Sequence, residues 1–182
     1  GGDGKSAYAR LVRGWAEATE GGARAEGGRS SVRVDPPSFS AGIALYTQGD
    51  LQGAETHFRV AMSSDLEPAQ RLESAYNLGV VLSELGRLDE AAEAYGRVLE
   101  ELDPKHEGSL LNLANLHLHA HLAATASDPA VPNRQVSNRR AGSEALRSAR
   151  ELTDRCLRHH PASELARQVD ARVRQAQGAL PS

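Results

Sequence analysis

Residues 75–104, AYNLGVVLSELGRLDEAAEAYGRVLEELDP, decide the fold of this chain. They contain two runs with the apolar spacing of short amphipathic helices, separated by a tight turn at Gly86. Small residues at Gly79 and Ala91 allow the two helices to approach closely, because no bulky side chain holds them apart. Pro104 ends the second helix, since proline lacks the amide that a further turn would need. The stretch therefore predicts a tight helical hairpin.

The same pattern occurs earlier in the chain, at a constant offset of 37 residues. Three pairs of residues share this offset: Gly42 and Gly79, Ala54 and Ala91, and Phe58 and Tyr95. An interrupted third copy follows, with a first helix opened by Leu110, Leu113 and Ala114 and a second helix carrying Ala149, Thr153 and Cys156. The chain therefore contains an internal repeat of helical hairpins.

The hairpin pattern resembles the tetratricopeptide repeat (TPR) family, with an aromatic residue and Leu-Gly in the first helix, then Ala, an aromatic residue and Pro in the second. The resemblance implies an all-α fold, a right-handed α-α superhelix of about three helix pairs in a TPR-like solenoid. We expect an N-terminal helical arm and linker at 1–34 and a TPR-like domain at 35–182. Within this domain we place repeats at about 35–70, 71–105 and 106–162, an insertion at 125–142 and a capping helix at 163–178.

The N-terminal arm has its own helical pattern. Residues 5–20 carry Tyr8, Leu11, Val12 and Trp15 at the spacing of an amphipathic helix. This helix either caps the first repeat by packing on it or docks on another subunit. Residues 21–37 are rich in Gly, Ser and Arg and end in Pro-Pro, which indicates a linker with little intrinsic order.

The insertion at 125–142 is long for a connection inside a compact domain. Pro129 and Pro132 resist helix and strand, so we expect an irregular segment. Its positive charge comes from Arg134, Arg139 and Arg140. Arginine side chains of this kind can bind carboxylates or phosphates of a partner. The segment is either a docking element or a tolerated surface insertion, since long loops cost little stability.

Composition argues against a general nucleic-acid binder, because the net charge is only -3. The charge is unevenly distributed. Residues 50–104 hold twelve acidic residues and four arginines, whereas residues 131–182 hold ten arginines and five acidic residues. This asymmetry indicates either two solvated faces or a partner with the opposite asymmetry.

No sequence motif for catalysis is present: the chain has no G-x-S-x-G, no P-loop, no cysteine pair and no H-E-x-x-H. His117, His119 and His121 form the one cluster that suggests a metal, and His117 and His121 could share an ion across one helical turn. No third ligand follows at a recognisable spacing, so we expect no metal, no cofactor and no enzymatic activity. Cys156 is the only cysteine, and we expect a buried, inert thiol.

The resemblance implies a concave groove lined by the first helix of each repeat. In chaperone-binding members, Lys, Asn and Arg grip a carboxylate, but here Phe39, Ile43 and Gly108 occupy clamp positions and only Asn77 matches. Asn77 and Asn112 hold equivalent positions, where an Asn either pairs with the amides of an extended peptide or bonds between helices. The apolar contacts beside them would come from Phe39, Ile43, Tyr46, Tyr76, Val80 and Leu111.

We therefore expect a non-catalytic protein-protein interaction module, a scaffold or accessory subunit of a larger assembly that binds a partner segment in its groove. The alternatives are a regulatory fragment of a larger enzyme or of a transport or assembly factor, and, more distantly, a metal-binding enzyme built on the histidine cluster. No signal or membrane-spanning segment is visible, so we expect an intracellular protein, cytoplasmic or organellar. The chain begins at Gly1 without Met, which suggests a processed, trimmed or partial chain.

Overall fold

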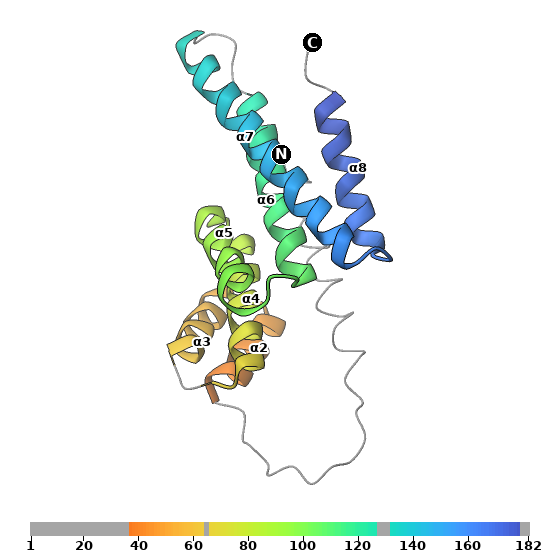
Figure 1. Ribbon diagram of the computed structural model, residues 1–182. Helices are drawn as coiled ribbons and strands as arrows, with labels where there is room; N and C mark the ends of the chain where they lie inside the picture. The colour runs from red at the N-terminus through yellow and green to blue at the C-terminus, as the bar shows by residue number, and fades with distance from the viewer. Residues whose placement is uncertain (1–36, 64–65, 127–131, 179–182) are drawn as a thin grey trace. The chain divides into compact units, whose positions relative to one another are not determined.

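The computed structural model describes residues 37–63, 66–126 and 132–178, and every element in these ranges is helical, which confirms the all-α fold. The helices pack into two compact units, of which the first ends at Val98 and the second begins at Leu99. The superhelix and the single domain over 35–182 stay predictions, and the N-terminal arm lies outside the described residues. In chain order the elements are α2 (Pro37–Gln48), α3 (Leu51–Ser63), α4 (Pro68–Glu84), α5 (Leu88–Arg97), the π-helical η1 (Val98–Leu102), α6 (Glu107–Thr125), α7 (Pro132–His159) and α8 (Glu164–Gly178) (Figure 1).

The first unit contains two helical hairpins, α2–α3 and α4–α5. Each turn is built on a glycine with positive φ, 84° at Gly49 and 79° at Gly86, a conformation that residues with a Cβ rarely adopt. The two glycines are 37 residues apart, as the repeat predicts. The predicted turn at Gly86 is therefore confirmed, and the first hairpin has the same turn.

Each hairpin closes on a contact between a glycine and an aromatic ring. A Cβ atom at Gly79 would lie 2.6 Å from Cε1 of Tyr95, and one at Gly42 would lie 2.8 Å from Cε1 of Phe58. Tyr95 is fully buried and Phe58 is 1% exposed. A second ring from the first helix packs beside each of them, with centroids 6.2 Å apart for Phe39 and Phe58 and 6.0 Å apart for Tyr76 and Tyr95.

The second unit is a longer hairpin, α6–α7, with α8 packed against both helices (Figure 1). The three residues predicted to line the second helix, Ala149, Thr153 and Cys156, are all fully buried. In α8, Val169 and Val173 are buried together with Ala166 and Ala176, whereas Leu165 is half-buried. A helix, α8, is present where the capping helix is predicted at 163–178, and the Ser163 hydroxyl accepts a 3.0 Å hydrogen bond from the Ala166 amide at its N-terminus.

The expectation that Pro132 resists helix is wrong. α7 begins at Pro132, so most of the segment predicted as an irregular insertion is an N-terminal extension of this helix. Proline is tolerated at the first helical position, where its missing amide would have had no intrahelical partner. Gly142 lies against α6, and its carbonyl accepts a 2.9 Å hydrogen bond from Nδ1 of His121. Pro129 lies outside the described residues.

The glycine–aromatic contact gives a direct stability test. Replacing Gly79 with Ala forces the Tyr95 ring out of its position, and we expect a loss of about 1–3 kcal/mol in the free energy of unfolding. The matched control is Gly96→Ala, since Gly96 lies in α5 with open space around its Cβ position. This control should stabilise by up to about 1 kcal/mol through helix propensity. Chemical denaturation measures both, and equal effects of the two substitutions would contradict the contact.

The start of α6 gives a pH test. His106 is the N-cap, and its Nδ1 accepts a 3.2 Å hydrogen bond from the Ser109 amide, so the ring must be neutral. Burial lowers the pKa of His106 below its ordinary 6.5, and its folded-state pKa therefore lies below the unfolded value. The cap therefore contributes fully to the free energy of unfolding when the pH is above the pKa of His106 in the unfolded chain. Its contribution is lost as the pH falls through the pKa of His106 in the folded state.

We expect His106→Asn, which keeps a capping acceptor but does not titrate, to lose less thermal stability than the parent between about pH 7.5 and about pH 5. His106→Ala, which removes the acceptor, should lose about 1 kcal/mol at neutral pH. Thermal melts of the three proteins at both pH values measure this difference. Identical pH dependence in the parent and the Asn variant would exclude a neutral capping role for His106.

Candidate functional site

The accessible residues predicted for the groove gather in the first unit, on α2 and α4. Phe39, Ile43 and Tyr46 follow the i, i+4, i+7 spacing along α2, and all three are half-buried. Asn77 on α4 is also half-buried. The Tyr46 hydroxyl donates a 2.7 Å hydrogen bond to Oε1 of Glu84, which lies two turns after Asn77 on the same stripe of α4. This bond joins the two helices near their C-terminal ends.

The other predicted groove residues are buried. The exposed fractions are 9% for Tyr76, 4% for Val80, 2% for Leu111 and 4% for Asn112. The Tyr76 ring packs on Tyr95 inside its hairpin, as described above. A partner could contact these side chains only after they became exposed. Their role in binding stays a prediction, and burial favours the packing role for Asn112.

Glu84 is a member of the α2–α4 surface that sequence reasoning missed. It belongs to a stripe of α4 with residues 73, 77 and 80, because these positions recur at helical spacing. Its half-buried carboxylate accepts the Tyr46 hydrogen bond across the helix pair. The i+7 spacing from Asn77 was a usable signal, but the partner on α2 depends on how the hairpins pack. We call Phe39, Ile43, Tyr46, Asn77 and Glu84 the α2–α4 surface.

The arginines of the predicted docking element lie at the start of α7. Arg140 is exposed, and its Nε forms a 3.2 Å ion pair with Glu144 one turn later. The side chains of Arg134 and Arg139 lie outside the described part of the chain. An ion pair within one exposed helix contributes little to stability, so Arg140 can exchange Glu144 for another carboxylate at little cost. Partner binding by these three arginines stays a prediction.

The histidine cluster is divided between core and surface. His121 is 3% exposed and donates its Nδ1 proton to the Gly142 carbonyl. His117 is half-buried, and desolvation lowers its pKa, whereas His119 is exposed. Among the described residues, no three His, Cys, Asp or Glu side chains are grouped so that they could hold a metal ion. Of the three histidines, His121 is the one that is buried and contributes to packing.

The single thiol is buried in the second unit. Cys156 is fully buried, and burial raises its pKa to about 12, with a further contribution from the negative charge of Glu107. The thiol is therefore protonated at neutral pH. Because the thiolate is the nucleophile, Cys156 does not have the properties of a reactive cysteine in the folded state.

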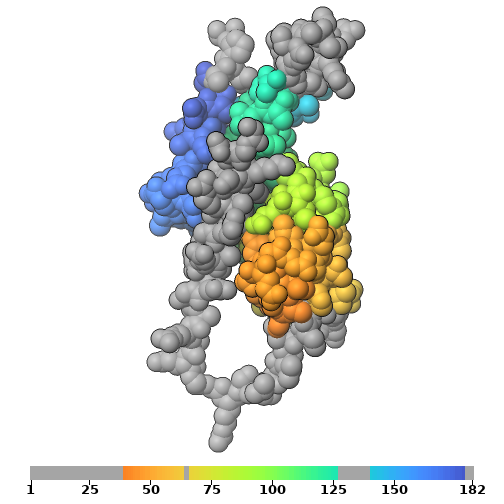
Figure 2. All heavy atoms as spheres, turned by 180° about the vertical axis from the view of Figure 1, so that it is seen from behind, coloured from red at the N-terminus to blue at the C-terminus, as the bar shows by residue number. Residues whose placement is uncertain are grey.

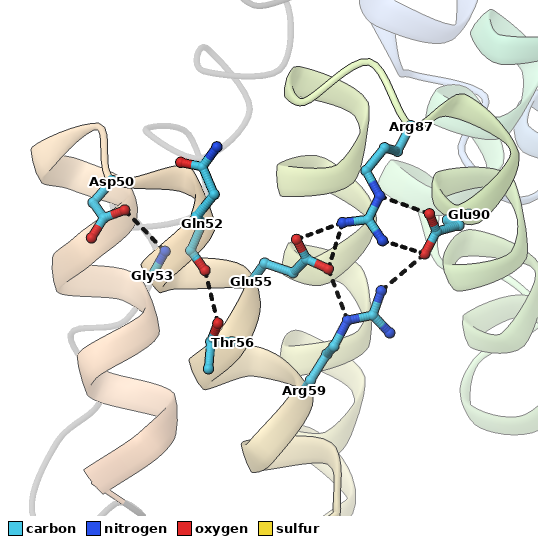
Figure 3. Close-up of polar contacts among 8 residues, drawn as sticks. All are labelled: Asp50, Gln52, Gly53, Glu55, Thr56, Arg59, Arg87 and Glu90. Carbon is cyan, nitrogen blue, oxygen red and sulfur yellow. Dashed lines mark hydrogen bonds and ion pairs between the residues drawn. The ribbon is translucent and has the colours of Figure 1, made fainter.

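Four charged side chains form a network between the two hairpins of the first unit (Figure 3). Arg87 donates to both carboxylate oxygens of Glu55 at 2.7 Å and to Glu90 at 2.6 Å. Arg59 bonds to the same two carboxylates. Burial opposes ionisation of Glu55, but its hydrogen bonds from Arg59 and Arg87 hold its pKa below the ordinary value. Two arginines neutralise two glutamates here, so the network joins α3 to α5 and offers no net charge to a ligand.

None of the helices in the described ranges has the length and apolar character that a membrane span requires. Of the surfaces described above, the α2–α4 surface combines accessible apolar, amide and carboxylate groups and is the most complete candidate for binding.

Comparison with known proteins finds no matching family model and no matching curated protein.

Proposed function

We propose that this chain binds a partner protein through the α2–α4 surface, as a non-catalytic interaction module. The observation that carries the proposal is the position of Asn77, a half-buried amide on the stripe of α4 whose Glu84 bonds to Tyr46 of the apolar stripe of α2. An Asn side chain donates and accepts at once, so it can pair with one peptide group of an extended segment. Phe39, Ile43 and Tyr46 then supply the apolar contacts that such a segment needs.

The charge of the surface specifies the partner further. Glu73 and Glu84 lie on either side of Asn77 along the same stripe of α4. Glu73 is exposed and Glu84 is half-buried, so a partner can approach both carboxylates. A basic side chain on the partner could pair with either of them. We therefore propose an extended segment with apolar side chains and at least one Lys or Arg.

We further propose that the hairpins belong to the tetratricopeptide class and stack as a right-handed superhelix. The support is the set of equivalent positions described above. Ala54, Ala91 and Ala149 are each fully buried, and so are Tyr95 and Thr153 at the next equivalent position, where Phe58 is 1% exposed. In such a stack the first helices of successive hairpins line one face, which is the face that carries the α2–α4 surface.

A photo-crosslinking amino acid at position 43 tests where the partner lies. In native extract it should form one stoichiometric adduct, whereas the same group at position 93 should not. Glu93 is the matched control because it is exposed on α5, outside the α2–α4 surface. Equal adducts at both positions would exclude a specific contact at the α2–α4 surface.

The affinity of the identified segment then tests the individual residues. Asn77→Ala should weaken binding about tenfold, because it removes hydrogen bonds worth about 1–1.5 kcal/mol. Ile43→Asp should weaken it at least as much, since it places a charge in an apolar contact. Glu93→Ala should leave the dissociation constant unchanged. Isothermal titration calorimetry measures all three, and wild-type affinity in both surface variants would refute the proposal.

A further inference from the structure

The first hairpin has a second, partly exposed surface, where α3 meets Leu45 of α2. Gly53, His57 and Val60 follow one another at i, i+4 and i+7 along α3. Leu45 of α2 lies beside them, because a Cβ atom at Gly53 would be 3.1 Å from Cδ1 of Leu45. Leu45, Gly53 and His57 are half-buried, and Val60 is 47% exposed. We call these four residues the end face.

The second hairpin indicates what covers such a face. The equivalent residues, 37 positions later, are Leu82, Glu90, Ala94 and Arg97. Leu82 is 1% exposed and Ala94 is 6% exposed. Helix α3 packs against α4 on this side, and its Arg59 binds Glu90 at 3.0 Å (Figure 3). In the second hairpin, the preceding hairpin therefore covers the part of the face that holds Leu82 and Ala94, whereas Arg97 is exposed.

The end face of the first hairpin is more apolar than its covered counterpart. Val60 stands where the second hairpin has Arg97, and Gly53 stands where it has Glu90. Among the described residues, Val60 and Leu122 are the only large apolar side chains that are exposed. Figure 2 shows the side chains of this hairpin, in orange, at the surface of the molecule. An apolar face at the end of a helical array requires a cap with a polar outer side.

We propose that residues 5–20 of this chain form a helix that covers the end face of their own first hairpin. Their apolar residues, Tyr8, Leu11, Val12 and Trp15, lie on one stripe, and the remaining positions are mostly polar or small. Such a helix would be about 24 Å long, and α3, with 13 residues, is about 20 Å long. The two lengths match, so one helix can cover the whole face.

The connection is long enough to permit this docking and short enough to favour it. Sixteen residues, 21–36, join the arm to α2. Sixteen residues reach at most about 53–58 Å, and α2 spans about 18 Å. The end face is therefore within reach of the arm on its own chain. A short tether keeps the local concentration of the arm near the millimolar range, which favours its own hairpin over a second copy.

The other end of the described chain has the same kind of cap. Helix α8 buries Val169 and Val173 against the α6–α7 hairpin, while Arg167 and Gln168 on its outer side are exposed. An amphipathic helix thus packs on the last hairpin, and we expect residues 5–20 to take the corresponding place before the first.

Trp15 is the only tryptophan, so its fluorescence reports on the arm directly. In the full chain we expect emission at short wavelength and weak quenching by acrylamide. Val60→Asp should shift the emission to longer wavelength and raise the quenching constant towards that of the unfolded chain. Leu122→Asp is the matched control, since Leu122 is 48% exposed in the second unit, and it should leave Trp15 unchanged. Far-UV circular dichroism verifies that both variants stay folded.

Three results would overturn the proposal. Trp15 with the emission and quenching of the unfolded chain in the parent protein would exclude docking. Shielded Trp15 in a folded Val60→Asp variant would place the arm elsewhere. Shielding that disappears on dilution, together with a dimer in size-exclusion chromatography with light scattering, would assign the arm to a second copy. These readouts do not involve the partner of the α2–α4 surface, so the two proposals can fail separately.

Discussion

The contact between a glycine on the first helix and an aromatic ring on the second determines how closely the helices of each hairpin in the first unit approach. The Tyr95 ring lies where a side chain at Gly79 would have to be, and the Phe58 ring is placed in the same way against Gly42. Close packing requires that a large residue on one helix meets a small one on the other. In the second unit the corresponding residues are Ala114 and Thr153, both fully buried. Their side chains differ less in size than glycine and an aromatic ring do.

This interface leaves the outer flanks of each hairpin to other interactions. One flank of the first hairpin faces the second, where Glu55, Arg59, Arg87 and Glu90 close the seam with charge-assisted hydrogen bonds. The seam is polar at its surface because two long arginines can cover apolar area with their stems while their heads stay in water. The opposite flank carries Val60 and no such charges. The two sides of one hairpin thus differ in chemistry because only one of them meets a described neighbour.

The second unit uses its extra length differently. Helix α7 has 28 residues, more than α3 with 13 or α5 with 10, and its Gly142 lies against the end of α6. Gly142 allows the close approach, since a Cβ atom there would be 3.1 Å from Cβ of Ala124, and the His121 ring fixes it through the Gly142 carbonyl. A buried histidine in this role needs a proton on Nδ1, because the carbonyl oxygen can only accept. The residue that first suggested a metal site therefore serves the packing of the hairpin.

The sequence by itself determined the hairpins, their turns and their buried faces. These features follow from the helical period, from a glycine at each turn and from the spacing of the Gly–aromatic pairs. All three are visible in the sequence without knowing which helices pack against one another. Only the tertiary structure decided which predicted contact residues are accessible. Ile43 and Asn77 remain half-exposed, whereas Val80, Leu111 and Asn112 are buried, because exposure depends on what covers a helix face. It also decided that Pro132 starts a helix, since the same proline ends one helix or begins another according to which backbone amides the fold leaves without partners.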